Sequence, residues 1–195
     1  ALSKLAQGLT AAEVTGRVII VPFMNTPAFH AGRRTSPIDK GNLNRSFPGK
    51  PDGSVTEKIA DYFNRTLLPL ADIVLDIHSG GRTLDFLPFA ACQVLPDKHQ
   101  QTQCEAGMRA FNAPYSMRML ELDAGSMYDT AAERQGKVFV TTELGGGGSS
   151  SARSVAIAER GVRNLLVHAG ILQGEVQARE TIMLTVSAGA ETAGC

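Results

Sequence analysis

The chain has 195 residues, of which 43% are hydrophobic, and its 19 Lys plus Arg are balanced by 19 Asp plus Glu. This composition excludes an intrinsically disordered chain, and the balanced charge argues against nucleic acid as a partner and against a polybasic membrane anchor. No apolar run approaches the roughly 20 residues that a membrane-spanning helix needs.

Helical spacing of apolar residues alternates with short β-branched and apolar runs along most of the chain. In chain order, the expected elements are a helix over residues 1–13, a buried strand over 17–22, a loop over 23–54, a helix over 55–68, strands over 71–78 and 86–94, helices over 98–112 and 126–135, a strand over 137–144 and a helix over 152–169. Such alternation predicts an α/β fold with a mostly parallel sheet. The glycine run 145–148 falls between a strand and a helix, so we expect a turn there rather than a flexible linker.

The cysteines Cys92, Cys104 and Cys195 form no C-x-x-C pair. This sparse, odd set argues against a disulfide framework and favours a reducing, cytoplasmic compartment. Cys92 and Cys104 are expected to be packed side chains rather than nucleophiles.

His78 lies where the pattern places the carboxyl end of a strand, and ligands of open α/β sheets bind outside such ends. Neutral imidazole is the commonest protein metal ligand, and Asp76 shares a strand face with His78 and could orient its ring. A lone strand-end histidine more often only bonds a loop, so both interpretations stay open on this observation.

Glu143 lies at the end of the strand expected over 137–144. Partial desolvation at such a position raises the pKa of a carboxylate toward the range of a general base. A surface glutamate at a strand end is an equally simple interpretation.

The loop over 23–54 contains Arg33, Arg34, Asn44 and Arg45. The planar fork of arginine suits carboxylates and oxyanions, and an adjacent asparagine adds an amide donor. Prolines and glycines around Asn44 favour a shaped loop over a merely solvated basic one.

Three motifs occur in order: Asn42–Gly49 (NLNRSFPG), Leu75–Gly81 (LDIHSGG) and Thr141–Gly146 (TTELGG). Together they resemble the succinylglutamate desuccinylase/aspartoacylase family, which are zinc hydrolases related in fold to the metallocarboxypeptidases. The stretch HSGGRTLDFLPF, which begins at His78, is most similar to the branch that contains the N-acetyl-diaminobutyrate deacetylases. The resemblance covers about residues 1–172.

The resemblance implies a zinc-dependent hydrolase that cleaves the amide bond of a small N-acyl amino acid. His78 matches the last of the three protein zinc ligands. Glu143 matches the carboxylate that activates water together with zinc and then protonates the leaving amine. Asn44 and Arg45 match the pair that holds the substrate carboxylate, and Arg34, or the arginine before it, lies near the position of the arginine that stabilises the oxyanion.

The family also implies a three-layer α/β/α fold with a mostly parallel mixed sheet. Its first two zinc ligands come from a His-x-x-Glu motif that this sequence does not contain. We therefore expect residues 1–172 to be a partial catalytic domain without that motif and without the first strand, and residues 173–195 to be a linker or a remnant of a C-terminal β domain. Because one histidine cannot hold zinc in a three-ligand geometry, the 195 residues alone are expected to be inactive.

Other functions stay open beside the amidohydrolase. The same residues would serve a metallocarboxypeptidase that acts on peptides, and the missing His-x-x-Glu motif favours a non-catalytic binding module. A nucleotide-binding domain is disfavoured because no Lys follows the glycine run. Arg82 and Asp85 could contact substrate or pair with each other, and the sequence leaves open the acyl group, the amino acid and whether the chain forms a homo-oligomer.

Overall fold

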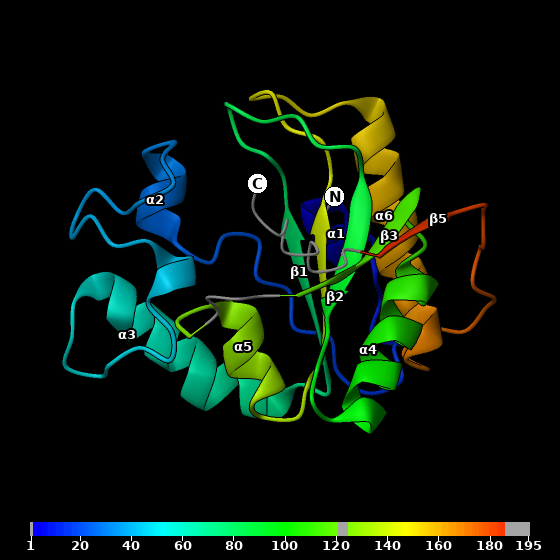
Figure 1. Cartoon of the computed structure of the whole chain (residues 1–195), viewed down its shortest axis with the longest axis horizontal. Helices are drawn as coiled ribbons and strands as arrows, with labels where there is room; N and C mark the ends of the chain where they lie inside the picture. Colours follow the sequence, from blue (N-terminus) through cyan, green and yellow to red (C-terminus); the bar gives the residue numbers. More distant parts are fainter. Residues whose placement is uncertain (1, 121–124, 186–195) are drawn as a thin grey trace, which may run out of the picture.

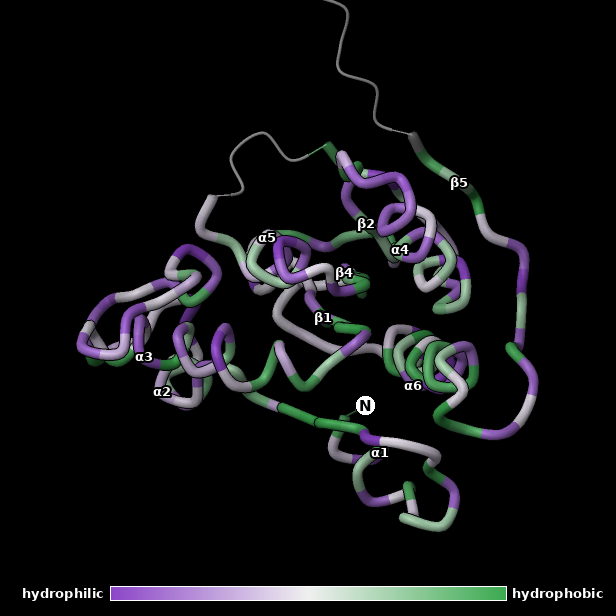
Figure 2. The backbone as a smooth tube through the Cα atoms, turned by 90° about the horizontal axis from the view of Figure 1, so that it is seen from below, coloured by the Kyte–Doolittle hydropathy of each residue, from purple (hydrophilic) through white to green (hydrophobic). Residues whose placement is uncertain are grey.

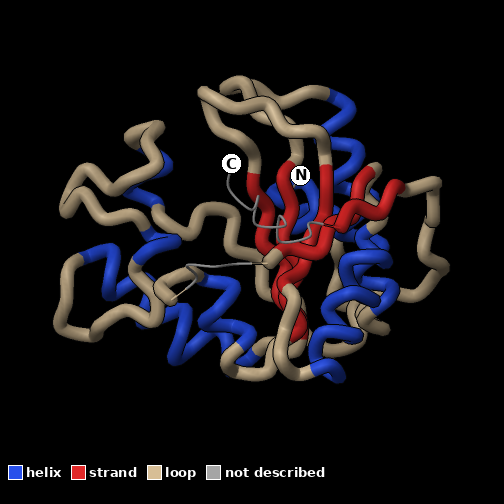
Figure 3. Tube along the Cα trace, in the orientation of Figure 1, coloured by secondary structure: helices blue, strands red, loops and turns tan. Residues whose placement is uncertain are grey.

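The computed structural model describes residues 2–120 and 125–185, and a five-stranded sheet with helices on both faces forms its centre (Figures 1 and 3). The strands, in spatial order, are β1 (Ile73–His78), β4 (Val138–Glu143), β2 (Phe89–Gln93), β3 (Tyr115–Met119) and β5 (Ile182–Thr185). All neighbouring strands are parallel except β2 and β4. The expected three-layer α/β fold with a mostly parallel mixed sheet is confirmed.

The helices expected over residues 55–68, 98–112, 126–135 and 152–169 occur close to those ranges. The described helices are α1 (Leu2–Gly8), α2 (Thr26–His30), η1 (Leu43–Arg45), α3 (Val55–Tyr62), η2 (Phe63–Leu67), η3 (Leu68–Leu70), α4 (Lys98–Phe111), α5 (Tyr128–Glu133) and α6 (Ala152–His168). Ser54 caps α3, because its hydroxyl accepts from the N–H of Glu57 while the Glu57 carboxylate accepts from the N–H of Ser54. No helix in the described ranges has both the length and the apolar character that a bilayer span requires.

The buried strand expected over residues 17–22 is wrong. The segment is extended, but it joins no strand in the described part of the chain, and Ile19 is 43% exposed. A β-branched run fits a pleated surface but becomes a strand only where a neighbouring strand completes the hydrogen bonds.

Further differences concern short elements. The helix expected over residues 1–13 ends at Gly8, the expected loop contains α2 and η1, and β3 was not predicted at all. Within residues 173–195, expected to be a linker or a remnant of a β domain, Ile182–Thr185 form β5, which pairs with β3. Residues 186–195, at the end of this segment, lie outside the described residues.

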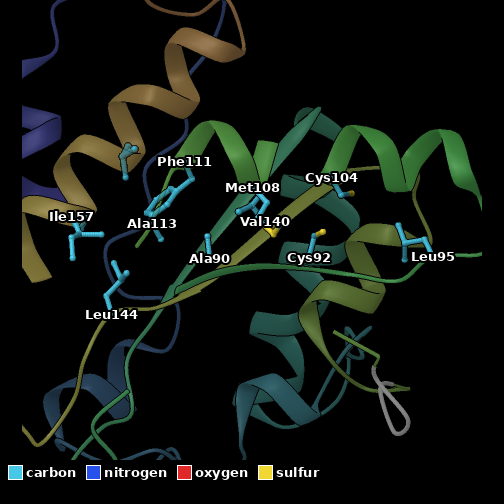
Figure 4. Packing of buried hydrophobic residues seen from close by; sticks show 12 residues of the cluster. Ala90, Cys92, Leu95, Cys104, Met108, Phe111, Ala113, Val140, Leu144 and Ile157 are labelled. Carbon is cyan, nitrogen blue, oxygen red and sulfur yellow. The ribbon is translucent and has the colours of Figure 1, made fainter. Parts of the chain in front are cut away.

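Side chains of the strands alternate between two hydrophobic clusters, one on each face of the sheet. On β4, Val140 packs in a cluster with α4 and α6, to which Phe111 and Ile157 contribute (Figure 4). The preceding residue, Phe139, packs with Tyr128 of α5 on the other face. Figure 2 shows α4 and α6 on one side of the strands and α3 and α5 on the other.

Cys92 and Cys104 belong to the α4–α6 cluster and are free and buried. Burial raises the pKa of the Cys92 thiol to about 12. The thiol therefore stays protonated at neutral pH, which confirms its interpretation as a packed side chain.

Candidate active site

His78 and Glu143 are the last residues of two neighbouring parallel strands, and they stand opposite each other in the register of β1 and β4. Adjacent strands lie about 4.8 Å apart, and residues in register point to the same face. By alternation from Phe139, that face is the one covered by α5. The topology thus brings together the two residues that the sequence singled out at strand ends.

Asp76 holds the imidazole of His78. Nε2 of His78 lies 2.7 Å from Oδ2 of Asp76, and the two side chains are 38% and 13% exposed. This hydrogen bond raises the pKa of His78, burial opposes the rise, and the charges of Asp76, Glu143 and Asp129 add to it. Because Nε2 is engaged, Nδ1 is the ring nitrogen left for another partner.

The carboxylate of Glu143 is partly desolvated. Burial raises its pKa, the charge of His78 opposes the rise, Asp76 reinforces it and Arg34 opposes it. Its Oε2 is buried and accepts no hydrogen bond within the described residues. An unsatisfied buried acceptor is costly by about 1–3 kcal/mol, so an oxygen of this kind marks a place where water or a ligand is held.

Arg34, whose charge lowers the pKa of Glu143, lies on a loop that Asp39 shapes. Oδ2 of Asp39 accepts from the N–H of Thr56 at 2.6 Å, and Oδ1 accepts from the N–H of Gly41 at 3.0 Å and from the hydroxyl of Thr56 at 2.8 Å. Burial raises the pKa of Asp39, but these bonds outweigh it and hold the pKa well below its usual range. The ionised carboxylate therefore fixes the loop against the start of α3.

Asn44 and Arg45 lie further along the same loop. Oδ1 of Asn44 accepts from the backbone N–H of Tyr128 at 2.8 Å, and its amide nitrogen makes no hydrogen bond within the described chain. The exposed side chain of Arg45 donates from Nη1 to the Asn44 carbonyl oxygen at 2.6 Å. Asn44 is thus tied to the start of α5, whereas the side-chain hydrogen bond that Arg45 makes within the described residues stays in its own loop.

Sequence reasoning missed Tyr128 and Asp129, which α5 brings over the site. The Tyr128 ring contacts the rings of Phe47 and Phe139, and burial, with the charge of Asp76, raises its pKa. Asp129 is 7% exposed and accepts from Nε2 of Gln93 at 3.2 Å. No local motif marks these residues, because only the docking of α5 places them beside Asp76 and His78.

The segments that follow β1 and β4 bind each other at the rim of the site. Gly80 donates to the Gly145 carbonyl at 2.9 Å, and Asp85 and Gly146 form an antiparallel bridge. The glycine run is therefore a structured turn, as expected. Arg82 and Asp85 form no ion pair with each other in the ranges that the structure covers.

Within residues 2–120 and 125–185, no group of three or more His, Cys, Asp or Glu is arranged to hold a metal ion. His78 nevertheless has the chemistry of one zinc ligand. A carboxylate that holds one ring nitrogen fixes the tautomer and leaves the other nitrogen free to coordinate, the arrangement usual for metal-binding histidines.

The fold is a three-layer α/β domain in which polar side chains gather at the carboxyl ends of two neighbouring parallel strands. The model of the succinylglutamate desuccinylase/aspartoacylase catalytic domain matches residues 1–169, and the chain belongs to this family.

Individual relatives are similar in sequence and structure. The chain is 66% identical over 177 residues to the N-alpha-acetyl-L-2,4-diaminobutyric acid deacetylase of Halomonas elongata, which covers 91% of this chain and 52% of that protein. The product-bound ectoine utilization protein EutE (DoeB) of Ruegeria pomeroyi is 67% identical with a TM-score of 0.93, over 95% of this chain and 57% of that one. A succinylglutamate desuccinylase of Silicibacter sp. TM1040 is 62% identical with a TM-score of 0.94, over 97% and 57%. The chain thus spans about half the length of these relatives.

Proposed function

We propose that this chain is the larger part of the catalytic domain of a zinc-dependent deacylase, which hydrolyses the amide bond of a small N-acyl amino acid. The observation that carries the proposal is the register of His78 and Glu143, which sets a metal-type histidine beside a carboxylate of raised pKa. The deacetylase name of the Halomonas elongata relative favours an N-acetyl group on a diamino acid.

His78 would supply one zinc ligand through Nδ1, with Asp76 holding Nε2. Bound zinc supplies Lewis acidity, which lowers the pKa of a water molecule and polarises the amide carbonyl. Glu143 accepts the proton of the attacking water at its unpartnered Oε2 and passes it to the leaving amine.

Three loop residues bind and orient the substrate. Arg34, whose charge acts on Glu143, stabilises the oxyanion of the tetrahedral intermediate, a contribution of about 3–4 kcal/mol for a well-placed donor. The free amide of Asn44 and the guanidinium of Arg45 hold the substrate carboxylate and set its register against the scissile bond.

A substrate panel tests the proposal. The protein, extended to the length of its relatives, is assayed with N-acetyl-diaminobutyrate, N-acetylaspartate, N-succinylglutamate and a short peptide, before and after chelation and with zinc restored. We expect zinc-restored hydrolysis of the N-acyl amino acids, led by N-acetyl-diaminobutyrate. Peptide cleavage alone would favour a carboxypeptidase, and no turnover despite bound substrate would favour a binding module.

A further inference from the structure

A cavity of about 220 Å³ lies in the α4–α6 layer, and its lining includes three arginines: Arg153, Arg160 and Arg179. We call it the arginine cavity. Arg153 and Arg160 lie two turns apart on α6, with Ile157 between them on the same face. The only carboxylate in its lining is that of Glu180.

Asn112 builds this cavity. It ends α4 in the left-handed conformation, with φ 56° and ψ 54°, and is 5% exposed. Its Oδ1 accepts from the N–H of Arg179 at 2.7 Å, and its Nδ2 donates to the carbonyl of Arg179 at 3.0 Å. Its own carbonyl accepts from Nη2 of Arg160 at 3.2 Å. The buried Asn112 therefore binds both the guanidinium of Arg160 and the backbone of Arg179, which brings these two arginines together.

The positive charge that lines this cavity exceeds the negative charge that lines it. None of the three arginines forms an ion pair within residues 2–120 and 125–185, and Nε of Arg160 is buried without a hydrogen-bond partner there. Burial, and then the charge of Arg179, lowers the pKa of Arg160. Arg153 lies in the first turn of α6, where the helix dipole adds to the positive potential.

The arginine cavity and the candidate active site lie on opposite faces of the sheet, but both lie near the end of the sheet where β4 ends and β3 begins. Pro114 lines the cavity and immediately precedes β3. The first residue of β3, Tyr115, pairs in register with Phe89 of β2. Phe89 in turn pairs in register with Glu143 of β4. Two strand spacings separate Tyr115 from Glu143, or about 10 Å. Ile157 in the cavity wall belongs to the cluster on the α4–α6 face, away from His78.

We propose that the arginine cavity binds a small oxyanion of the phosphate kind. Three guanidinium groups and one carboxylate leave two positive charges, which a dianion would balance. Guanidinium forks match the geometry of phosphate oxygens, and the Nε–H of Arg160 is a donor that has no partner within the described residues.

Binding of inorganic phosphate is measured by calorimetry and by thermal unfolding, against sodium chloride of equal ionic strength. We expect saturable binding and a rise in Tm for the unchanged chain. The affinity should fall by about tenfold in Arg153→Gln and in Arg160→Gln, since each removes a charged hydrogen-bond donor. Arg153 is exposed, so its variant keeps the test valid if Arg160→Gln does not fold.

Arg163→Gln is the matched control, because it removes the same charge from an exposed position of α6 outside the cavity lining. It should bind phosphate as the unchanged chain does, and Glu180→Gln should bind it more tightly. Equal binding by all variants, or no binding by the unchanged chain, would overturn the proposal. Binding that is lost when the protein is extended to the length of its relatives would also overturn it, because a carboxylate of the protein would then fill the cavity.

Discussion

Asn44 and Tyr128 are 84 residues apart in the chain, yet the Asn44 side chain accepts the first N–H of α5 at 2.8 Å. The loop that carries the candidate substrate residues is thereby fixed to the helix that covers Asp76 and His78. The oxygen of Asn44 thus positions α5, and the proposed function gives its amide a second, separable task in binding the substrate.

Two substitutions separate these tasks. Asn44→Asp keeps an acceptor for the N–H of Tyr128, and its negative charge suits a helix N-terminus, so stability should be retained while substrate binding is lost. Asn44→Ala loses both functions and should also lower the free energy of unfolding by about 1 kcal/mol. Urea unfolding and steady-state kinetics measure the two effects. Equal stability of both variants would contradict the positioning role.

Glu143→Gln tests the assigned general base. The amide is nearly isosteric but cannot accept the proton, so kcat should fall by about 10²–10⁴-fold in the protein extended to the length of its relatives. Zinc content, measured by elemental analysis, should not change, because Glu143 is not assigned as a ligand. Glu175→Gln, at an exposed position, is the control and should keep full activity. Unchanged turnover in Glu143→Gln would remove this residue from the mechanism.

Strong local patterns predicted much of this fold. The long amphipathic α6 and the apolar β4 lie close to where periodicity places them. The apolar residues that each of them buries lie within one short stretch of sequence, so the pattern can be recognised locally. Residues 17–22 carry an equally strong β pattern and still form no strand, since a strand depends on a neighbour. By contrast β3, with the sequence YSMRM, alternates apolar and polar residues over only five positions, and it is a strand where β2 and β5 flank it.

The same distinction applies to the candidate site. His78 and Glu143 could be predicted because each ends an apolar strand, and strand ends gather at one edge of a sheet. Tyr128 and Asp129 could not, because their place beside Asp76 depends on how α5 docks rather than on any nearby motif. Tertiary packing therefore completes a site of which the sequence pattern indicates only the strand-end residues.

Asp39 makes the loop of Arg34 sensitive to acid. Its pKa is lower in the folded chain than in the unfolded one, so its stabilising contribution is present above the unfolded value of about 3.9 and is lost as the pH falls toward the folded value. Asp39→Asn should therefore be less stable than the unchanged chain at pH 7, and the difference should shrink below about pH 4. Urea unfolding between about pH 3 and pH 7 measures the difference, with the exposed Asp52→Asn as control. A difference that does not depend on pH would contradict this role of the carboxylate.

Gly146 allows the turns after β1 and β4 to meet. A Cβ at Gly146 would lie 2.0 Å from the carbonyl oxygen of Leu84, whereas a Cβ at Gly147 would meet nothing within 4 Å. Gly146→Ala should therefore break the bridge to Asp85 and displace the rim of the site, which would lower both Tm and turnover. Gly147→Ala, whose φ of 65° also favours glycine, should lower the free energy of unfolding by only about 1 kcal/mol. Amide hydrogen exchange over the segments after β1 and β4 measures the loss directly, and equal protection in the two variants would show that the close contact at Gly146 does not hold the rim together.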